Sequence, residues 1–182
     1  MCSSDLGSVA HLLDLLQRNN RTLAQLATRG GEPMRTALDG TEAVFTRARA
    51  VSSDGKAGAG ERVAAIRLLG RGRKGQEEDF DRLSAMLAAG QPAEVQLAVV
   101  AALGRFNRTT TPERLLAGWP GYGPTVRTAV LDLILARPAW AQVLLDRAEQ
   151  DAAFRAQIDP GRRTVLAQHP QSKLANRAAA IF

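Results

Sequence analysis

The chain has 182 residues, of which 45% are hydrophobic but only 4% aromatic, with one cysteine and a formal net charge of +6. A single cysteine excludes a disulfide within the chain and any CxxC metal motif or CxxCH haem motif. No apolar run approaches the roughly 20 residues that a membrane-spanning helix needs. The apolar residues are mostly Ala, Leu and Val, without turn-bounded runs of β-branched and aromatic residues, and this pattern favours an all-α fold.

The positive charge comes almost entirely from arginine. Lysine occurs only at Lys56, Lys74 and Lys173, which leaves 21 of the 24 basic residues as Arg. So lopsided a ratio, beside so much Ala and Gly, is typical of coding by a GC-rich genome. A solvated Arg-rich surface therefore explains the charge more simply than a nucleic-acid site, and an anionic partner stays open as the alternative.

The chain begins with Met-Cys-Ser-Ser-Asp-Leu, the translation of a common sequencing-adapter tail read from a GTG start. We therefore expect residues 1–7 to be a non-native cloning or assembly scar that does not belong to the natural fold. Residues 8–59 carry apolar positions at helical spacing but without a regular period. A break is expected at Gly30-Gly31, then one longer helix from Glu32-Pro33 through Phe45, and then a glycine-rich loop over residues 52–60.

Residues 60–182 are more regular. The segment 61–70 predicts a short helix that ends at Gly70 in a left-handed cap, and residues 71–75 predict a basic turn. An amphipathic helix with an acidic start is expected over residues 77–89, and Pro92 opens the next one.

A proline in the first turn predicts the start of several later helices. Pro112 follows a threonine that is expected to cap its helix, and residues 120–124 predict a turn before the next apolar stripe. Pro138 begins another helix. Asp159-Pro160 repeats the combination of cap and proline, and a last helix is expected to run to the end of the sequence.

These helices repeat. Gly70 and Gly104 occupy matching positions 34 residues apart, and Val95 and Val126 match at a separation of 31. Paired helices with a period in the thirties or forties are the signature of an α-solenoid, because no single pair can bury its apolar face alone. The sequence therefore predicts a HEAT-like α-α superhelix of about 4–6 helical pairs, with irregular repeats over residues 8–59 and HEAT-like repeats over residues 60–182. The aligned segments are ERVAAIRLLG (61–70), EVQLAVVAALG (94–104), TVRTAVLDLIL (125–135) and KLANRAAAIF (173–182).

A basic ladder along the concave face of such a superhelix is the candidate binding face. It would consist of Arg35, Arg62, Arg73 and Arg127, three of which follow the apolar anchor of a repeat. Such a ladder could hold phosphates. The simpler interpretation is structural, because an Arg at this position can bond carboxylates and backbone carbonyls of the adjacent repeat.

No residue is identified as catalytic, cofactor-binding or metal-ligating. His11 and His169 are the only histidines, and neither stands in a pattern typical of a metal site or a catalytic triad. Lys74 lies in a glycine-rich turn, but it is followed by Gly75 and preceded by a helix, unlike a phosphate-binding loop. The aromatic residues Trp119, Tyr122 and Trp140 are interpreted as core packing rather than a stacking platform for a base or sugar.

Several longer phrases of residues 60–182 resemble one family. They are AAIRLLGRG (64–72), PAEVQLAVVAALGRF (92–106), LLAGWPGYGPTVRTAVLDLILARPAWAQVLLD (115–146), IDPGRRTVLAQHP (158–170) and NRAAAIF (176–182). Together they resemble the HEAT region of the PVC-type haem-binding membrane-bound dehydrogenase-like proteins. In that family the helical region lies between an N-terminal β-propeller and a C-terminal cytochrome c domain with a CxxCH motif, and the proteins are usually exported.

The resemblance implies a role for the segment rather than an activity. The chain has neither a propeller nor a CxxCH motif, so no catalytic or haem-ligating residue of the family can be carried over. What it implies is a non-catalytic scaffold, the connector of a larger exported protein with c-type haem, whose partners are the neighbouring propeller and cytochrome c domains. The alternative is a free-standing HEAT-repeat binding protein that engages nucleic acid or an acidic protein through the basic concave face.

Overall fold

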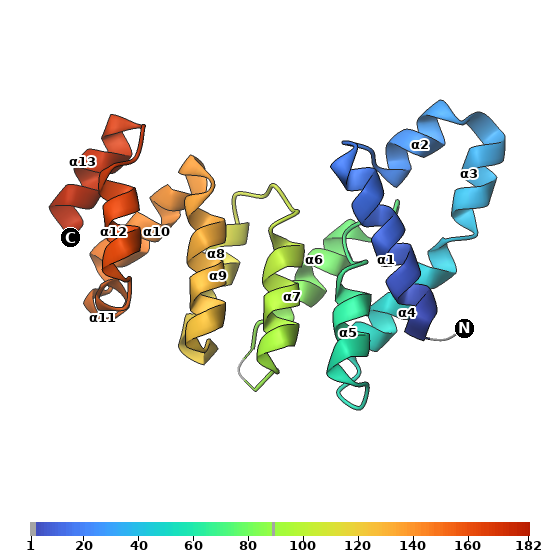
Figure 1. The fold of residues 1–182 in the computed structure, drawn as a ribbon, viewed down its shortest axis with the longest axis horizontal. Helices are drawn as coiled ribbons and strands as arrows, with labels where there is room; N and C mark the ends of the chain where they lie inside the picture. Colours follow the sequence, from blue (N-terminus) through green and yellow to red (C-terminus); the bar gives the residue numbers. More distant parts are fainter. Residues whose placement is uncertain (1–2, 89) are drawn as a thin grey trace. The chain divides into compact units, whose positions relative to one another are not determined.

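The computed structural model describes residues 3–88 and 90–182, and all regular structure in these ranges is helical (Figure 1). The predicted all-α class is therefore confirmed for the described residues. The chain divides into two compact units, an N-terminal unit, Met1–Phe106, and a C-terminal unit, Asn107–Phe182. Met1 and Cys2, which begin the predicted scar, and Ala89, where the helix starting at residue 77 was expected to end, lie outside the described residues.

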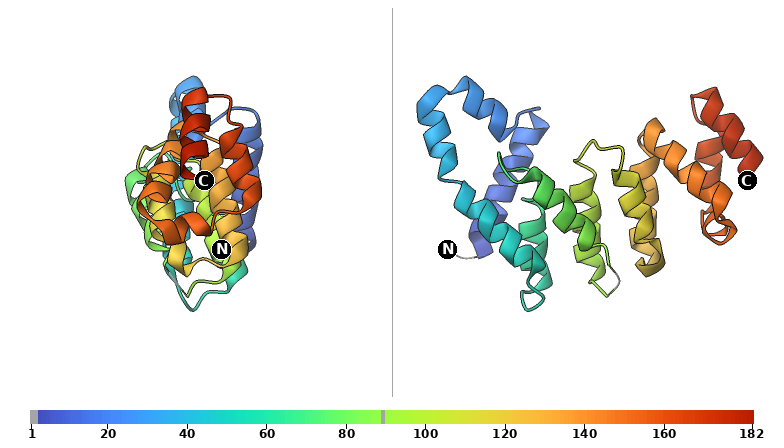
Figure 2. Two further views of the ribbon diagram at one scale, coloured as in Figure 1. Left: turned by 90° about the vertical axis from the view of Figure 1, so that its left-hand side faces the viewer. Right: turned by 180° about the vertical axis from the view of Figure 1, so that it is seen from behind.

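The N-terminal unit is built in two layers of helices. Helix α5 packs against α1, α4 and α7, and α7 also packs against α6. Seen from opposite sides in Figures 1 and 2, α5 and α7 lie on one side of the unit and α4 and α6 on the other. The helices are α1 (Ser3–Arg18), α2 (Leu23–Arg29), α3 (Gly31–Asp39), α4 (Glu42–Ser53), α5 (Ala59–Ile66), α6 (Gln76–Ala85) and α7 (Ala93–Leu103).

The apolar positions that repeat in the sequence form the core between these layers. Ile66, Leu69, Leu83, Val99 and Leu103 are all fully shielded from solvent. Each such side chain contributes about 1.5–3 kcal/mol relative to an exposed one. The helices of this unit are short, so this burial, rather than helix propensity, stabilises them.

The helix expected from Glu32-Pro33 through Phe45 is interrupted. It forms two helices, α3 and α4, because the Thr41 hydroxyl donates a hydrogen bond of 2.6 Å to the carbonyl of Leu38 and closes a turn after Gly40. Helix α3 has no buried residue, whereas α4 buries Phe45 in the core. The two helices therefore also differ in burial, which depends on tertiary contacts and is not contained in the local pattern.

The C-terminal unit is arranged around α10, which contacts α8, α9, α11 and α13, while α12 packs on α13. Asp151 and Asp159 cap α11 and α12 by accepting the backbone N–H groups of Phe154 and Arg162, so the predicted cap at Asp159 is confirmed. The elements are α8 (Thr111–Ala117), the 3-10 turn η1 (Trp119–Gly121), α9 (Pro124–Leu135), α10 (Pro138–Gln150), α11 (Ala152–Ala156), α12 (Pro160–Ala167) and α13 (Ser172–Ile181). Among the described residues, no helix combines the length and apolarity that crossing a membrane would require.

Candidate functional site

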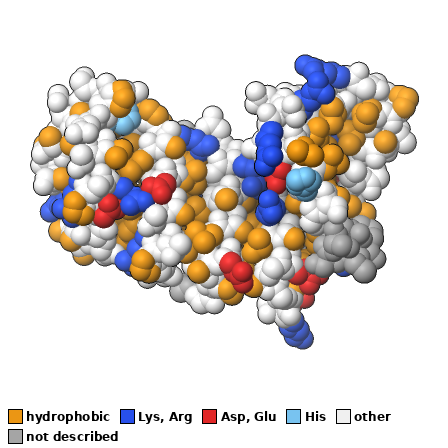
Figure 3. Space-filling model, in the orientation of Figure 1, with side chains coloured by type: hydrophobic (Ala, Val, Ile, Leu, Met, Phe, Trp, Pro, Cys, Tyr) orange, Lys and Arg blue, Asp and Glu red, His pale blue; other side chains and the backbone are white. Residues whose placement is uncertain are grey.

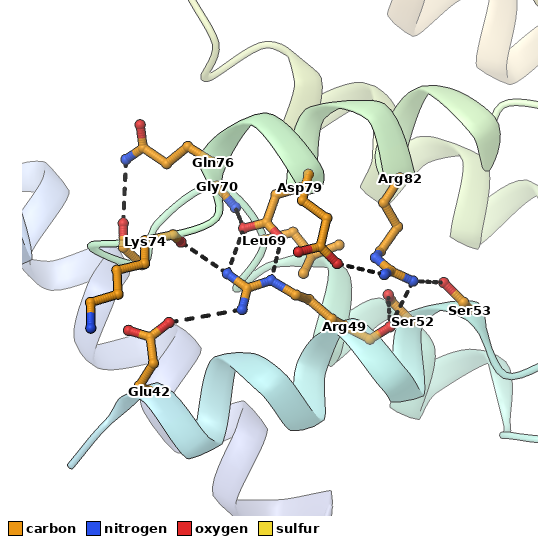
Figure 4. Close-up of polar contacts among 12 residues, drawn as sticks. Glu42, Arg49, Ser52, Ser53, Leu69, Gly70, Lys74, Gln76, Asp79 and Arg82 are labelled. Atoms are coloured by element: carbon orange, nitrogen blue, oxygen red, sulfur yellow. Dashed lines mark hydrogen bonds and ion pairs between the residues drawn. The ribbon is translucent and has the colours of Figure 1, made fainter. Parts of the chain in front are cut away.

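A buried carboxylate joins α4 to α6 in the N-terminal unit (Figure 4). Asp79 in α6 is fully buried, and its Oδ1 accepts a hydrogen bond of 2.7 Å from Nε of Arg49 in α4. Its Oδ2 accepts the backbone N–H of Gly70 at 2.8 Å. Gly70 has a φ of +75°, a left-handed conformation that glycine adopts without strain, as the sequence predicted. One carboxylate therefore ties the turn after α5 to two helices.

Further hydrogen bonds join this network to the rest of the unit. Nη2 of Arg49 donates to the carbonyl of Lys74 at 2.9 Å, and the hydrogen bond to Asp79 raises the pKa of Arg49 above its ordinary value. Arg82 donates to the Ser53 hydroxyl at 2.9 Å (Figure 4). Because both oxygens of Asp79 are hydrogen-bonded and shielded from water, the network holds helices together and offers no acid or base to a substrate.

Two of the four predicted binding-face arginines lie next to each other. Nη1 of Arg73 donates to the Asp39 carboxylate at 3.0 Å and to the backbone carbonyl of Arg35 at 3.4 Å. Both side chains line a shallow depression together with residues of α2. The side chain of Arg35 is 52% exposed and lies 3.8 Å from Glu32. Arg35 is therefore accessible to a partner, whereas the Arg73 side chain is only 24% exposed.

Arg62 and Arg127, the other two, are engaged by their own units. Arg62 is buried; its Nε donates to the carbonyl of Ser52 at 3.1 Å and its Nη2 to the Gln91 side chain at 2.8 Å. In the C-terminal unit, Nη1 of Arg127 donates to Oε1 of Gln157 at 2.7 Å. The Arg127 guanidinium also lies 5.2 Å from the centre of the Trp119 ring. Both side chains donate to backbone carbonyls and to glutamine side chains of their own unit.

Three aromatic residues of the C-terminal unit pack in its core, as predicted. Trp119, Tyr122 and Trp140 are each 3% exposed. The Trp119 ring meets Phe154 edge-on at a centroid distance of 4.9 Å, and the Tyr122 hydroxyl donates to the carbonyl of Leu115 at 3.0 Å. Buried in this way, they provide no platform for a base or sugar.

Within the described residues, neither histidine lies in a cluster of side chains that could hold a metal ion. Nδ1 of His169 accepts the backbone N–H of Gln171 at 3.1 Å, close to the start of α13, and His11 is exposed on α1. Within residues 3–88 and 90–182, no group of three or more His, Cys, Asp and Glu side chains is placed to hold a metal ion.

A cavity that the sequence did not indicate lies between α1, α2 and the turn that follows α5. It has a volume of about 280 Å³ and is referred to below as the α1–α2 cavity. Arginine reaches it from three segments that are distant in the chain: Arg21 before α2, Arg71 after α5, and Arg105 after α7. The lining residues are Leu13, Leu16, Gln17, Arg21, Thr22, Leu23, Ala24, Gly70, Arg71, Gly72, Gln76 and Arg105.

Positive charge exceeds negative charge around this cavity. Asp14 of α1 accepts hydrogen bonds from Arg71 at 2.6 Å and from Arg67 at 2.9 Å. Among the described residues, the hydrogen bonds of the Arg105 side chain go to carbonyl oxygens, those of Leu69 at 3.0 Å and Arg67 at 3.3 Å. Burial, with a smaller effect of the neighbouring Arg71 charge, lowers the pKa of Arg105 to about 10, so the side chain stays cationic at neutral pH. In Figure 3, basic side chains gather beside α1 next to exposed hydrophobic ones.

Only one local feature of the sequence, the basic turn over residues 71–75, points to this cavity. The pattern of this turn does not distinguish Arg71 from Arg73. Arg21 and Arg105 belong to no basic motif in the sequence. Only the packing of α1 against α5, and of α5 against α7, brings them together. Compared with protein-family models, curated proteins and solved structures, the chain has no match.

Proposed function

We propose that this chain is a non-catalytic helical-repeat scaffold, a HEAT-like superhelix of about 4–6 helical pairs. The observation that supports this most is the use of charged side chains inside the fold. The buried Arg49–Asp79 pair links neighbouring helices of one layer, α4 and α6, across the turn after α5. A rigid stack needs such cross-links, whereas a hydrolytic or redox site needs reactive groups that meet in an accessible cleft.

As a scaffold, the chain would be the connector of a larger exported protein with c-type haem, in line with the resemblance of residues 60–182. Its partners would be a propeller on one side and a cytochrome c domain on the other, and it would bind no haem of its own. Sequencing the genomic DNA on both sides of this reading frame tests the assignment directly. A propeller upstream and a CxxCH motif downstream are the expected result, and a native start and stop that enclose the helical region alone would contradict it.

The superhelix can be tested on the isolated chain by small-angle X-ray scattering. A compact domain of 182 residues would have a radius of gyration of about 16 Å. A row of stacked pairs is longer in one direction, so we expect a value clearly above that figure and an asymmetric distance distribution. A symmetric distribution at about 16 Å would contradict the superhelix. Haem added to the purified chain should give no stoichiometric Soret band, and a stoichiometric band would contradict a scaffold role.

A second candidate is a free-standing HEAT-repeat protein that binds nucleic acid or an acidic protein. The adjacency of Arg35 and Arg73 beside a shallow depression favours it. The measurement is affinity for duplex DNA and for a polyglutamate peptide at several salt concentrations, with Arg35→Gln compared with Arg47→Gln, a partly buried arginine of α4 that does not line this depression. Phosphate binding must weaken steeply as salt rises, and equal affinities for the two variants would contradict this candidate.

A further inference from the structure

The α1–α2 cavity is divided between apolar and cationic walls. Leu13, Leu16 and Leu23 come from α1 and α2, and Arg21, Arg71 and Arg105 come from the segments around them. No Asp or Glu is among the residues that line the cavity. A volume of about 280 Å³ lies just below the range of about 300–1,000 Å³ that is typical of small-molecule sites. The cavity thus suits a small amphipathic group better than a nucleic-acid duplex.

The arginines around this cavity carry more positive charge than the neighbouring carboxylate can balance. The nearest carboxylate, Asp14, is shared between Arg67 and Arg71. Within the described residues, Arg105 feels the charge of Asp14 but has no hydrogen-bonded carboxylate, and the Arg21 guanidinium makes no hydrogen bond or ion pair. Burial matters for Arg105, because a poorly solvated guanidinium is costly unless an anion or several acceptors compensate it, whereas Arg21 is exposed. An incoming anion would supply the missing negative charge.

We propose that the α1–α2 cavity binds a carboxylate that is carried on a short apolar group. Arg21 and Arg105 supply the donors for the carboxylate, and Leu13, Leu16 and Leu23 enclose the apolar group. Guanidinium groups favour carboxylates because their planar donors match two oxygens at once. An inorganic phosphate or a nucleic-acid backbone would leave the leucine wall without a partner.

The ligand could be a free organic acid or an acidic side chain of a protein partner, since the recognised chemistry is the same. The test titrates the ¹⁵N-labelled chain with sodium hexanoate and follows the backbone amides of Gly70 and Gly72, which line the cavity. Parallel titrations use hexan-1-ol, hexylamine, sodium acetate, sodium phosphate and the capped peptide acetyl-Leu-Glu-Leu-amide. The peptide and hexanoate arms separate the two sources, and the tighter ligand identifies the physiological class.

Hexanoate, the peptide or both should shift the two glycine amides saturably. Acetate should bind at least about tenfold more weakly than hexanoate, since it lacks the apolar chain and burying only two of the missing methylene groups would account for that factor. Hexan-1-ol and hexylamine should not saturate, because they carry no anionic group. Equal binding of hexan-1-ol and hexanoate would contradict the role of the arginines. Equal binding of phosphate and hexanoate would contradict the role of the leucines, and no saturable shift with either carboxylate would overturn the site.

Arg21→Gln tests the donor without disturbing the fold, since Arg21 is exposed and makes no side-chain bond to the described residues. We expect its affinity for the carboxylate to fall about tenfold, the usual effect of removing a charged hydrogen bond. The matched control is Arg29→Gln, which removes an exposed arginine of α2 that does not line the cavity. Circular dichroism at 222 nm verifies that both variants fold. An equal loss in the two variants would show general charge attraction and contradict the proposal.

Discussion

Replacing Asp79 should destabilise the N-terminal unit more than any other change of a single charge on α6. In Asp79→Ala, Arg49 loses its 2.7 Å partner and the N–H of Gly70 loses its acceptor. The Arg49 side chain is 13% exposed, so water can replace the carboxylate only in part. Removing one member of a buried ion pair costs about 3–5 kcal/mol, and we expect a loss of this size.

The loss should be visible in urea unfolding. A slope of about 1–3 kcal/mol per molar urea is usual for a unit of this size, so the midpoint should fall by about 2 M. Tryptophan fluorescence is unsuitable as a probe, because both tryptophans, Trp119 and Trp140, belong to the C-terminal unit. Hydrogen exchange at the Gly70 amide reports the N-terminal unit specifically, whereas circular dichroism reports the helices of both units, and the Gly70 amide should exchange faster in the variant.

A neighbouring residue provides the control. Asp81 lies on the same helix but is exposed, so Asp81→Asn makes the same change of charge as Asp79→Asn without breaking the buried network. The control should change stability by less than about 0.5 kcal/mol. Similar midpoints for the two Asn variants, or unaltered exchange at Gly70, would refute the argument that Asp79 fastens α4, α6 and the turn after α5.

Three further outcomes follow from local geometry. Gly70→Ala should cost about 2–4 kcal/mol in urea unfolding, since an added Cβ would lie 2.3 Å from the Phe106 ring in a left-handed conformation; a loss below about 1 kcal/mol would contradict this. The backbone N–H of Phe154 lowers the pKa of Asp151, so this carboxylate stabilises the C-terminal unit above its unfolded pKa of about 3.9, and the contribution disappears as pH falls through the lower folded value. Asp151→Asn should therefore reduce the drop in urea midpoint between pH 6 and pH 3, and an unchanged drop would contradict it. Burial raises the pKa of Tyr122, the only tyrosine, so absorbance at 295 nm should stay flat through pH 10 and rise only on further alkalinisation or unfolding; an increase centred near pH 10 in the folded chain would contradict it.

The sequence by itself determined the features that depend on neighbouring residues. Periodic Ala, Leu and Val positions predicted the all-α class, Asp159-Pro160 predicted a capped helix start, and Gly70 predicted a left-handed turn. These features follow from hydrogen bonds and backbone conformations that span only a few residues, so a local pattern contains them. The superhelix, the connector role and the four-arginine binding face stay predictions.

Only the tertiary structure decided which polar residues are buried and which arginines converge. Asp79 stands in an acidic helix start that looks solvent-exposed in the sequence, yet it is buried against Arg49, 30 residues away. Arg21, Arg71 and Arg105 likewise meet at one cavity from three separate segments. The physical reason is that the charge of a side chain is a local property, whereas its exposure to water and its partners depend on helices that are distant in the chain and adjacent only after folding.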